Sequence, residues 1–212
     1  MIPNSLDKIV LSIIEPTNEA VIKLNKISHR QKYKSSDEIT KEVLRVLYEY
    51  NSKIKNIMGN SQLPIDDLPL ELIVDDLLWY CITRFNVKCS DKEIDKKYKV
   101  GRVSDYLFPY ELQYRLGFII IENRFHELYE QAYDKHGKVK DLEAEKMYKT
   151  YSTLLQQISK FPSLRKILYR QIGQLCIRYL YERGILKETP EGYIISTEHP
   201  KVQEVMKKFY RY

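Results

Sequence analysis

The chain has 212 residues, of which 43% are apolar and 30% charged, so it can bury the core of one large domain or two small ones. No apolar run approaches the roughly 20 residues that span a bilayer, and the N-terminal MIPNSLDKIV lacks the basic segment of a signal peptide. Three cysteines without CxxC spacing and four scattered histidines argue against a disulfide framework and a zinc site. We therefore expect an intracellular, cytoplasmic protein with no membrane partner and a thermophile-like composition.

Helical periodicity dominates the chain from its N-terminal region to about residue 136. Apolar side chains recur three and four residues apart, which is the pattern of helices with one buried face. Gly59, Pro64 and Pro69 interrupt this pattern and predict a loop. GFIIIENRF, at 117–125, fits a buried strand as well as a helix. The predicted helices cover residues 19–33, 35–58, 69–85 and 109–136.

Residues 90–108, SDKEIDKKYKVGRVSDYLF, predict a short helix, a tight turn and a second helix. Ser90 and Glu93 form a capping box that favours a helix start, and Gly101 favours a turn. With the helix predicted before it, this segment resembles the helix-turn-helix family, in which the second helix enters the DNA major groove. The resemblance implies DNA contacts from Lys96, Lys97 and Arg102.

Two other interpretations of the same region stay open. The helix order from 19 to 107 also resembles one cyclin-type repeat of the TFIIB-like transcription factors. Alternatively, residues 90–108 form an ordinary pair of packed helices, because their net charge is small and helix pairs of this kind are common in all-α domains.

The last third of the chain predicts further helices and one β-hairpin. ILKETPEGYIIS, at 185–196, has two short apolar runs around Thr-Pro-Glu-Gly, which is typical of a hairpin. Before it, SLRKILYRQIGQLCIRYLYERG predicts one helix that Gly184 ends, or two helices, SLRKILYR and QIGQLCIRYLYERG, which together with YSTLLQQISKF make three. A last helix covers 199–212. Three helices followed by a hairpin resemble a winged-helix domain, which implies a module that binds DNA or protein.

Positive charge is concentrated in this region. The net charge is +6, and residues 108–212 contribute +5 of it. Such a cluster can neutralise phosphates, although a solvated helix face would have the same composition. The side chains expected to contact DNA phosphates are Arg165, Lys166, Arg170, Arg178, Arg183 and Lys187.

An enzymatic alternative rests on a resemblance to PD-(D/E)xK nucleases of the archaeal Holliday-junction resolvase type. That family places a Glu on a helix, an Asp on a strand, and a Glu and a Lys two residues apart on the next strand. The matching order here is Glu71, Asp105, Glu122 and Arg124. The resemblance implies that the acids bind Mg²⁺ or Mn²⁺. Arg124 stands where Lys is expected, and an Arg side chain is a poor substitute because it cannot be deprotonated.

These observations predict a mostly α protein: a helical bundle with a helix-turn-helix-like element and a C-terminal winged-helix-like unit containing one β-hairpin. The predicted domains are residues 1–137 and 138–212. The main functional hypothesis is a DNA-binding protein of transcription or replication, without a cofactor or metal. A homodimer is compatible with it, because such modules commonly read two half-sites. The alternatives are the metal-dependent nuclease and a scaffold that binds a protein partner.

Overall fold

The computed structural model describes residues 4–30, 35–64, 67–84, 109–190 and 192–209. These residues are mostly helical, as the sequence predicts, with one two-stranded antiparallel sheet in which Leu186 pairs with Ile195. The helices are α1 (Ser5–Arg30), α2 (Ser36–Gly59), α3 (Leu70–Arg84), α5 (Pro109–Ala132), α6 (Leu142–Ser159), α7 (Pro162–Glu182) and α8 (Pro200–Phe209). The strands are β1 (Leu186–Thr189) and β2 (Gly192–Ile195).

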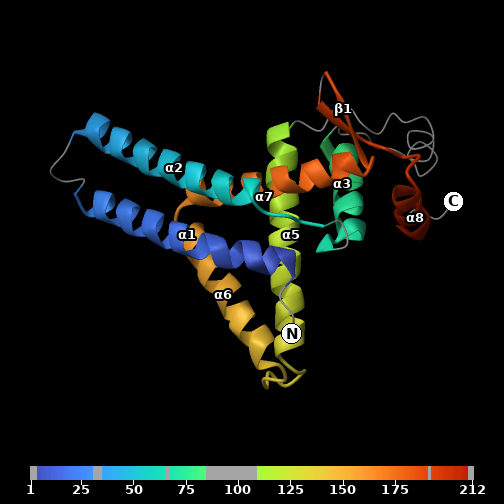
Figure 1. Ribbon diagram of the computed structural model, residues 1–212, viewed down its shortest axis with the longest axis horizontal. Coiled ribbons are helices and arrows are strands. Elements are labelled where there is room, and N and C mark those ends of the chain that lie inside the picture. The colour runs from blue at the N-terminus through green and yellow to red at the C-terminus, as the bar shows by residue number, and fades with distance from the viewer. Residues whose placement is uncertain (1–3, 31–34, 65–66, 85–108, 191, 210–212) are drawn as a thin grey trace.

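Helices α1 and α2 lie side by side as a long arm (Figure 1). The start of α1 is earlier than the pattern at 19–33 predicts, because the apolar residues before Pro16 are helical and buried too. The Thr17 hydroxyl donates to the carbonyl oxygen of Ile13 at 2.7 Å and lies 3.1 Å from the Tyr50 hydroxyl of α2. Helix α2 begins with a capping box between Ser35 and Glu38, which satisfies backbone donors at its first turn.

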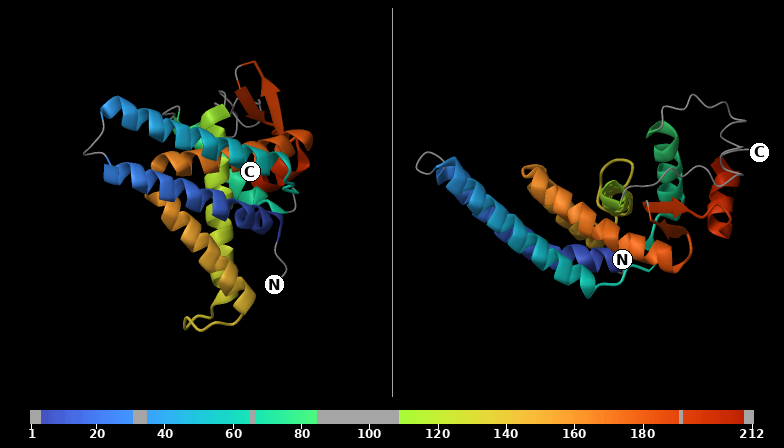
Figure 2. Two further views of the ribbon diagram at one scale, coloured as in Figure 1. Left: turned by 60° about the vertical axis from the view of Figure 1, so that its left-hand side comes forward. Right: turned by 90° about the horizontal axis from the view of Figure 1, so that it is seen from above.

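Helix α7 crosses α5 near the centre of the molecule (Figures 1 and 2). Two glycines permit the close approach. A Cβ atom on Gly117 of α5 would overlap the backbone carbonyl of Tyr169, and a Cβ on Gly173 of α7 would overlap that of Gln113. Each helix therefore presents a glycine to the backbone of the other, and larger residues at these two positions would force the helices apart.

The three-helix pattern predicted before the hairpin differs from the structure. Residues 163–184 belong to the single helix α7 and its end, which confirms the prediction of one helix there; the division into helices at 163–170 and 171–184, which the winged-helix resemblance requires, is wrong. Gly173 does not break it, since this glycine is buried in the crossing with α5. The predicted helix stop at Gly184 is confirmed, because this residue has φ of 72° and directly follows the last turn.

The hairpin and α8 complete one end of the molecule. Ile185, Leu186 and Ile195 are buried where the hairpin meets α7. Helix α8 packs against α3, at the opposite end of the molecule from the C-terminal end of α1 and the start of α2 (Figure 2). One hydrophobic core includes side chains from both sides of residue 137, so the two predicted units share an interior. The resemblance to a winged-helix domain stays a prediction.

Two expectations concern the middle of the chain. The strand considered for 117–125 is wrong, because these residues lie inside α5. An apolar run such as Phe118–Ile121 satisfies either structure, and here Ile120 and Ile121 are buried while Phe118 is half exposed, in a helix that packs against α7 and α6. The helix-turn-helix-like element at 90–108 lies outside the described residues.

Within the described ranges, no helix is both long and apolar enough to cross a membrane.

The crossing of α5 and α7 leads to a test of stability. Gly117→Ala and Gly173→Ala should each lower the free energy of unfolding by at least about 2 kcal/mol, because the added methyl group meets backbone that cannot rotate away. Gly59→Ala is the matched control: nothing lies within 4 Å of its Cβ position. Urea unfolding followed by circular dichroism measures the three values. If Gly117→Ala and Gly173→Ala are as stable as Gly59→Ala, the helices do not cross as closely as described.

Candidate functional site

Four of the predicted DNA-contacting residues lie on α7. One face of this helix is buried, and the opposite face carries a row of polar side chains three or four residues apart. We call this row the α7 stripe; it consists of Lys166, Arg170, Gln174, Arg178 and Tyr181. Arg183 follows the last turn of α7 and is exposed, and Lys187 on β1 lies 3.9 Å from Glu198. The single basic cluster of the sequence is thus spread along about 30 Å of one helix and its continuation.

The N-terminal turns of α5 and α7 enclose a groove of about 510 Å³. Arg165 and Lys166 contribute positive charge from α7. Tyr110 and Tyr114 contribute aromatic rings from α5, and the Tyr110 side chain is 67% exposed. We call this the α5–α7 groove; its lining residues are Tyr110, Glu111, Tyr114, Arg115, Pro162, Arg165 and Lys166.

Aromatic rings and guanidinium groups are in direct contact at this groove. The guanidinium carbon of Arg170 lies 4.2 Å from the ring centroid of Tyr110, which is a cation–π geometry. The rings of Tyr114 and Phe118 meet Tyr169 edge-on, with centroids 5.5 and 5.9 Å away. The Tyr169 hydroxyl donates to Glu122 at 3.3 Å, and burial together with this carboxylate raises the pKa of Tyr169 above its ordinary value.

The cations of the groove differ in their partners. Arg115 forms a two-point ion pair with Asp76, with distances of 2.8 and 2.6 Å. In the part of the chain that the structure describes, Arg165, Lys166 and Arg170 form no ion pair with a carboxylate. The Nε atoms of Arg165 and Arg170 are also buried without a hydrogen-bond acceptor. The outer nitrogen atoms of these two guanidinium groups, and the ammonium group of Lys166, are therefore not committed to a carboxylate of the described residues.

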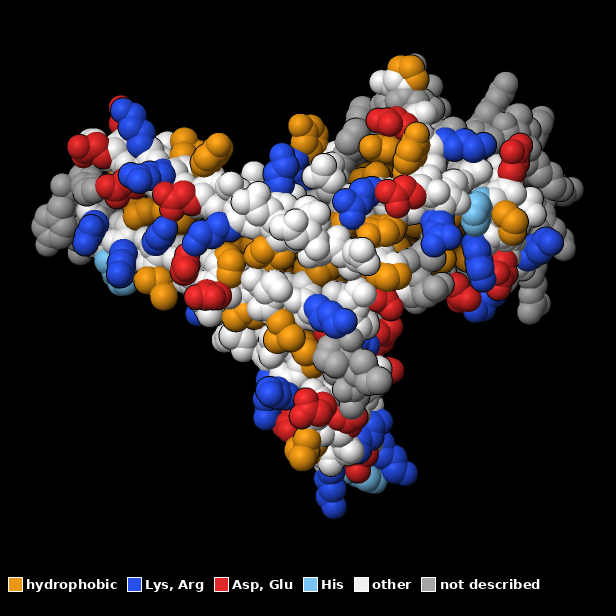
Figure 3. All heavy atoms as spheres, viewed as in Figure 1, with side chains coloured by type: hydrophobic (Ala, Val, Ile, Leu, Met, Phe, Trp, Pro, Cys, Tyr) orange, Lys and Arg blue, Asp and Glu red, His pale blue; other side chains and the backbone are white. Residues whose placement is uncertain are grey.

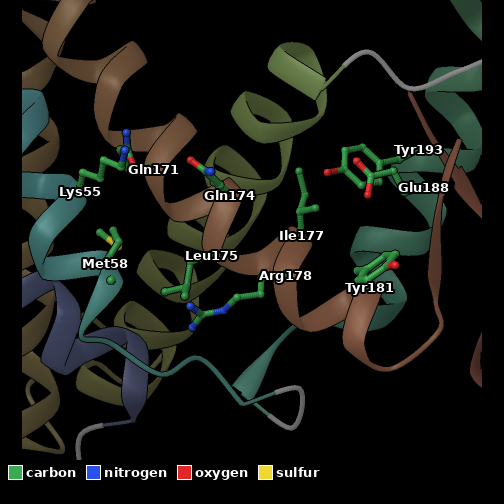
Figure 4. Close-up of a pocket in the computed structure, with 11 residues that line it drawn as sticks. Lys55, Met58, Gln171, Gln174, Leu175, Ile177, Arg178, Tyr181, Glu188 and Tyr193 are labelled. Carbon is green, nitrogen blue, oxygen red and sulfur yellow. The ribbon is translucent and has the colours of Figure 1, made fainter. Parts of the chain in front are cut away.

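A second groove, of about 400 Å³, continues along α7 toward the hairpin. Figure 4 shows Lys55 and Met58 of α2 on one side and Glu188 and Tyr193 of the hairpin on the other. We call this the hairpin groove; its lining residues are Lys55, Met58, Gly59, Gln171, Gln174, Leu175, Ile177, Arg178, Tyr181, Glu188 and Tyr193.

Two side chains of the hairpin groove are held by neighbours. Nη2 of Arg178 donates to the Ser61 carbonyl oxygen and the Tyr179 hydroxyl, both at 3.4 Å. Gln171 donates to Asn51 of α2 at 2.9 Å. These bonds link α7 to the middle of α2 and to the residues that follow α2, on one side of the groove.

The residues of the nuclease hypothesis are not brought together in the described structure. Glu71 on α3 pairs with Lys208 of α8 at 2.6 Å, far along the chain from Glu122. Glu122 and Arg124 lie on helix α5 instead of a strand, and Asp105 lies outside the described residues. A search of the described residues finds no group of three or more His, Cys, Asp or Glu side chains that could hold a metal ion.

Arg124 has a structural role instead. It is buried, and its guanidinium donates to both carboxylate oxygens of Asp7, at 2.8 and 3.1 Å. Asp7 also accepts from the Tyr151 hydroxyl at 3.1 Å. Burial opposes the charge of Arg124, but its bonds with Asp7 and Glu127 outweigh burial and raise the pKa of the guanidinium. This network joins α1, α5 and α6 and leaves Arg124 no access to a substrate.

Several groove residues were not singled out in the sequence. Tyr110 and Tyr114 are four residues apart directly after Pro109, a spacing that places them on one helix face. Only the crossing with α7 sets them beside Arg165 and Arg170. Lys96, Lys97 and Arg102, which were singled out, lie outside the described residues.

Comparisons with protein-family models, curated proteins and solved structures find no match to this chain. We therefore infer the function from the two grooves and the charged side chains that line them.

The buried ion pair leads to a second test of stability. Asp7→Asn keeps the side-chain volume but leaves the buried Arg124 charge poorly compensated, which should cost about 3 kcal/mol of unfolding free energy. Adding Arg124→Met should recover part of this loss, because the double variant no longer buries an unpaired charge. Lys23→Gln, which removes an exposed pair with Glu49 at 2.7 Å, is the control and should barely change the melting temperature. An unchanged melting temperature for Asp7→Asn would contradict the structural role of the pair.

Proposed function

We propose that this protein binds DNA at the α5–α7 groove. Arg165, Lys166 and Arg170 contact phosphates there, and the exposed ring of Tyr110 stacks on a base. The observation that carries the proposal is the stack of Arg170 on Tyr110, beside two further cations that form no ion pair with any carboxylate of the described residues. Cationic side chains beside aromatic rings suit a polyanion whose bases have π-faces.

The electrostatic surroundings support an anionic ligand. The chain carries a net charge of +6 and has a calculated pI near 9.0, which favours association with nucleic acid. Helix α7 begins at Pro162, which lines the groove, so the positive end of its dipole lies beside Arg165 and Lys166. The basic side chains and the positive end of the helix dipole therefore both attract an anion to the α5–α7 groove.

The proposed setting is transcription or replication in the cytoplasm, where an intracellular protein of this kind meets DNA. A homodimer would bring two grooves to one DNA molecule, and a protein partner would bring a second factor to it; both belong to the same proposal.

The nuclease hypothesis is not carried forward, because Glu122 accepts a hydrogen bond from Tyr169 and Arg124 is committed to Asp7.

The proposal predicts a charge-specific loss of DNA affinity. The triple variant Arg165→Ala, Lys166→Ala, Arg170→Ala should bind a fluorescent oligonucleotide at least roughly tenfold more weakly at low salt. The slope of log K against log salt should also fall by about 2, because each lost phosphate contact removes about 0.7 from the slope for a single strand. Fluorescence anisotropy at several salt concentrations measures both quantities.

A variant with the same change in net charge is the control. Lys8, Lys41 and Lys135 are exposed and belong to the α1–α2 arm and the turn after α5. Acidic and basic side chains are interspersed over both regions (Figure 3). Their triple substitution by Ala should leave most of the affinity and the slope in place. Equal losses in the two triple variants would show that net charge alone attracts DNA, and the proposed site would be wrong.

A further inference from the structure

We infer that the DNA ligand is a single strand, which runs along the α7 stripe from the α5–α7 groove and places one base in the hairpin groove. This inference rests on the proposed function and names the form of DNA and its path. The stripe is continuous, because Lys166 lines the first groove, Arg170 lies under Tyr110, and Arg178 and Tyr181 line the second.

The length of the path suits several nucleotides. Lys166 and Tyr181 are separated by fifteen residues of one helix, which corresponds to about 22 Å along its axis. Phosphates of one stacked strand are about 3.4 Å apart along the helix axis, and a strand laid out on a protein surface is longer still. A few nucleotides therefore reach from the first groove to the second, whereas a trinucleotide bound at Arg165 does not.

The walls of the path argue for a single strand. To read a duplex, a helix must protrude into a major groove about 12 Å wide and 8.5 Å deep. The second half of the α7 stripe, with Gln174, Arg178 and Tyr181, instead lines a recess that has Lys55 and Met58 of α2 on one side and Glu188 and Tyr193 of the hairpin on the other (Figure 4). A single strand can turn its bases into the recess.

The lining of the hairpin groove suits a base better than a phosphate. Tyr181 is 51% exposed and Tyr193 is partly exposed, so both rings can offer a face for stacking. The side chains of Gln174 and Glu188 form no hydrogen bond with other side chains or backbone of the described residues. The Glu188 carboxylate repels phosphate but accepts a hydrogen bond from an amino group, such as N4 of cytosine.

A phosphate next to this base would contact Arg178. Arg178 uses Nη2 to hold Ser61 and Tyr179, and these bonds do not engage its Nη1 and Nε atoms. Its side chain is exposed at the edge of the groove, one helical turn before Tyr181. The guanidinium carbon lies 5.0 Å from the ring centroid of Tyr179, so this part of α7 combines a cation with aromatic rings, as single-strand sites do.

The test compares two lengths of single-stranded DNA by anisotropy, at about three and about nine nucleotides, the longer one able to cover the 22 Å path. Tyr181→Ala should weaken binding of the longer strand about tenfold and leave the shorter one unchanged, because only the longer strand has a base that reaches and stacks on this ring. Tyr48→Ala is the matched control, since Tyr48 is 77% exposed on the α1–α2 arm, and it should change neither affinity. Melting temperatures of both variants check that the fold is intact.

Base preference is the second readout. The wild type should bind oligo-dC more tightly than oligo-dT, and Glu188→Gln should narrow this ratio, because an amide can face either base with a donor or an acceptor. An affinity of Tyr181→Ala for the longer strand equal to that of the wild type would overturn the inference. So would tighter binding of a duplex, of the same sequence in RNA, or of an acidic peptide that competes with the strand.

Binding at the α5–α7 groove and the path along α7 can be disproved separately. If the triple variant at Arg165, Lys166 and Arg170 weakens DNA binding but Tyr181→Ala does not, the α5–α7 groove stands and the path along α7 is wrong. If neither change affects binding, the proposed function fails as well.

Discussion

The close crossing of α5 and α7 is the constraint on which the rest of the structure depends. Gly117 and Gly173 let each helix touch the backbone of the other, which no larger side chain permits. This contact sets the first turns of α5 against the first half of α7, so that Tyr110 covers Arg170 and Tyr114 faces Tyr169. The α5–α7 groove is thus a product of helix packing, and a small separation of the helices would remove it.

The remaining helices hold α7 so that only one face meets solvent. Helix α2 and α5 pack on it, and Gln171 donates to Asn51 of α2. The buried network of Asp7, Arg124 and Tyr151 fixes α1 and α6 relative to α5. A helix covered in this way is rigid, and its exposed side chains keep a constant spacing. For a ligand with regularly spaced charges, such preorganisation reduces the entropy lost on binding.

The sequence predicted what local pattern controls and missed what depends on distant contacts. The helical class, the hairpin at 185–196 and the helix end at Gly184 follow from periodicity and turn residues. The interpretation of 117–125 stayed open because an apolar run fits helix and strand alike, and packing against α7 decides for a helix. Residues 163–184 fit one helix or two in the sequence, and they form one, with Gly173 in a crossing that the sequence does not reveal.

The candidate site likewise combines residues that the sequence identified with residues that only the folded structure revealed. Charge counting identified Arg165, Lys166 and Arg170, because their concentration is visible in one stretch of sequence. It could not identify Tyr110, which is sixty residues away from Arg170 and meets it only in the folded chain. The nuclease resemblance placed Arg124 at the position of a catalytic Lys, whereas its actual partner, Asp7, is 117 positions away. Residue type thus led to the hypothesis of an anionic ligand, and tertiary contacts determine which of these side chains lie together.

Photocrosslinking of single-stranded DNA to the protein is the most direct test of the central claim. An oligonucleotide with a photoreactive base at each position in turn should crosslink to Tyr110 at one end and to Tyr181 or Tyr193 at the other, as identified by mass spectrometry of the peptides. This order would place one strand across both grooves. Crosslinks confined to the α1–α2 arm, or scattered without relation to base position, would contradict the account.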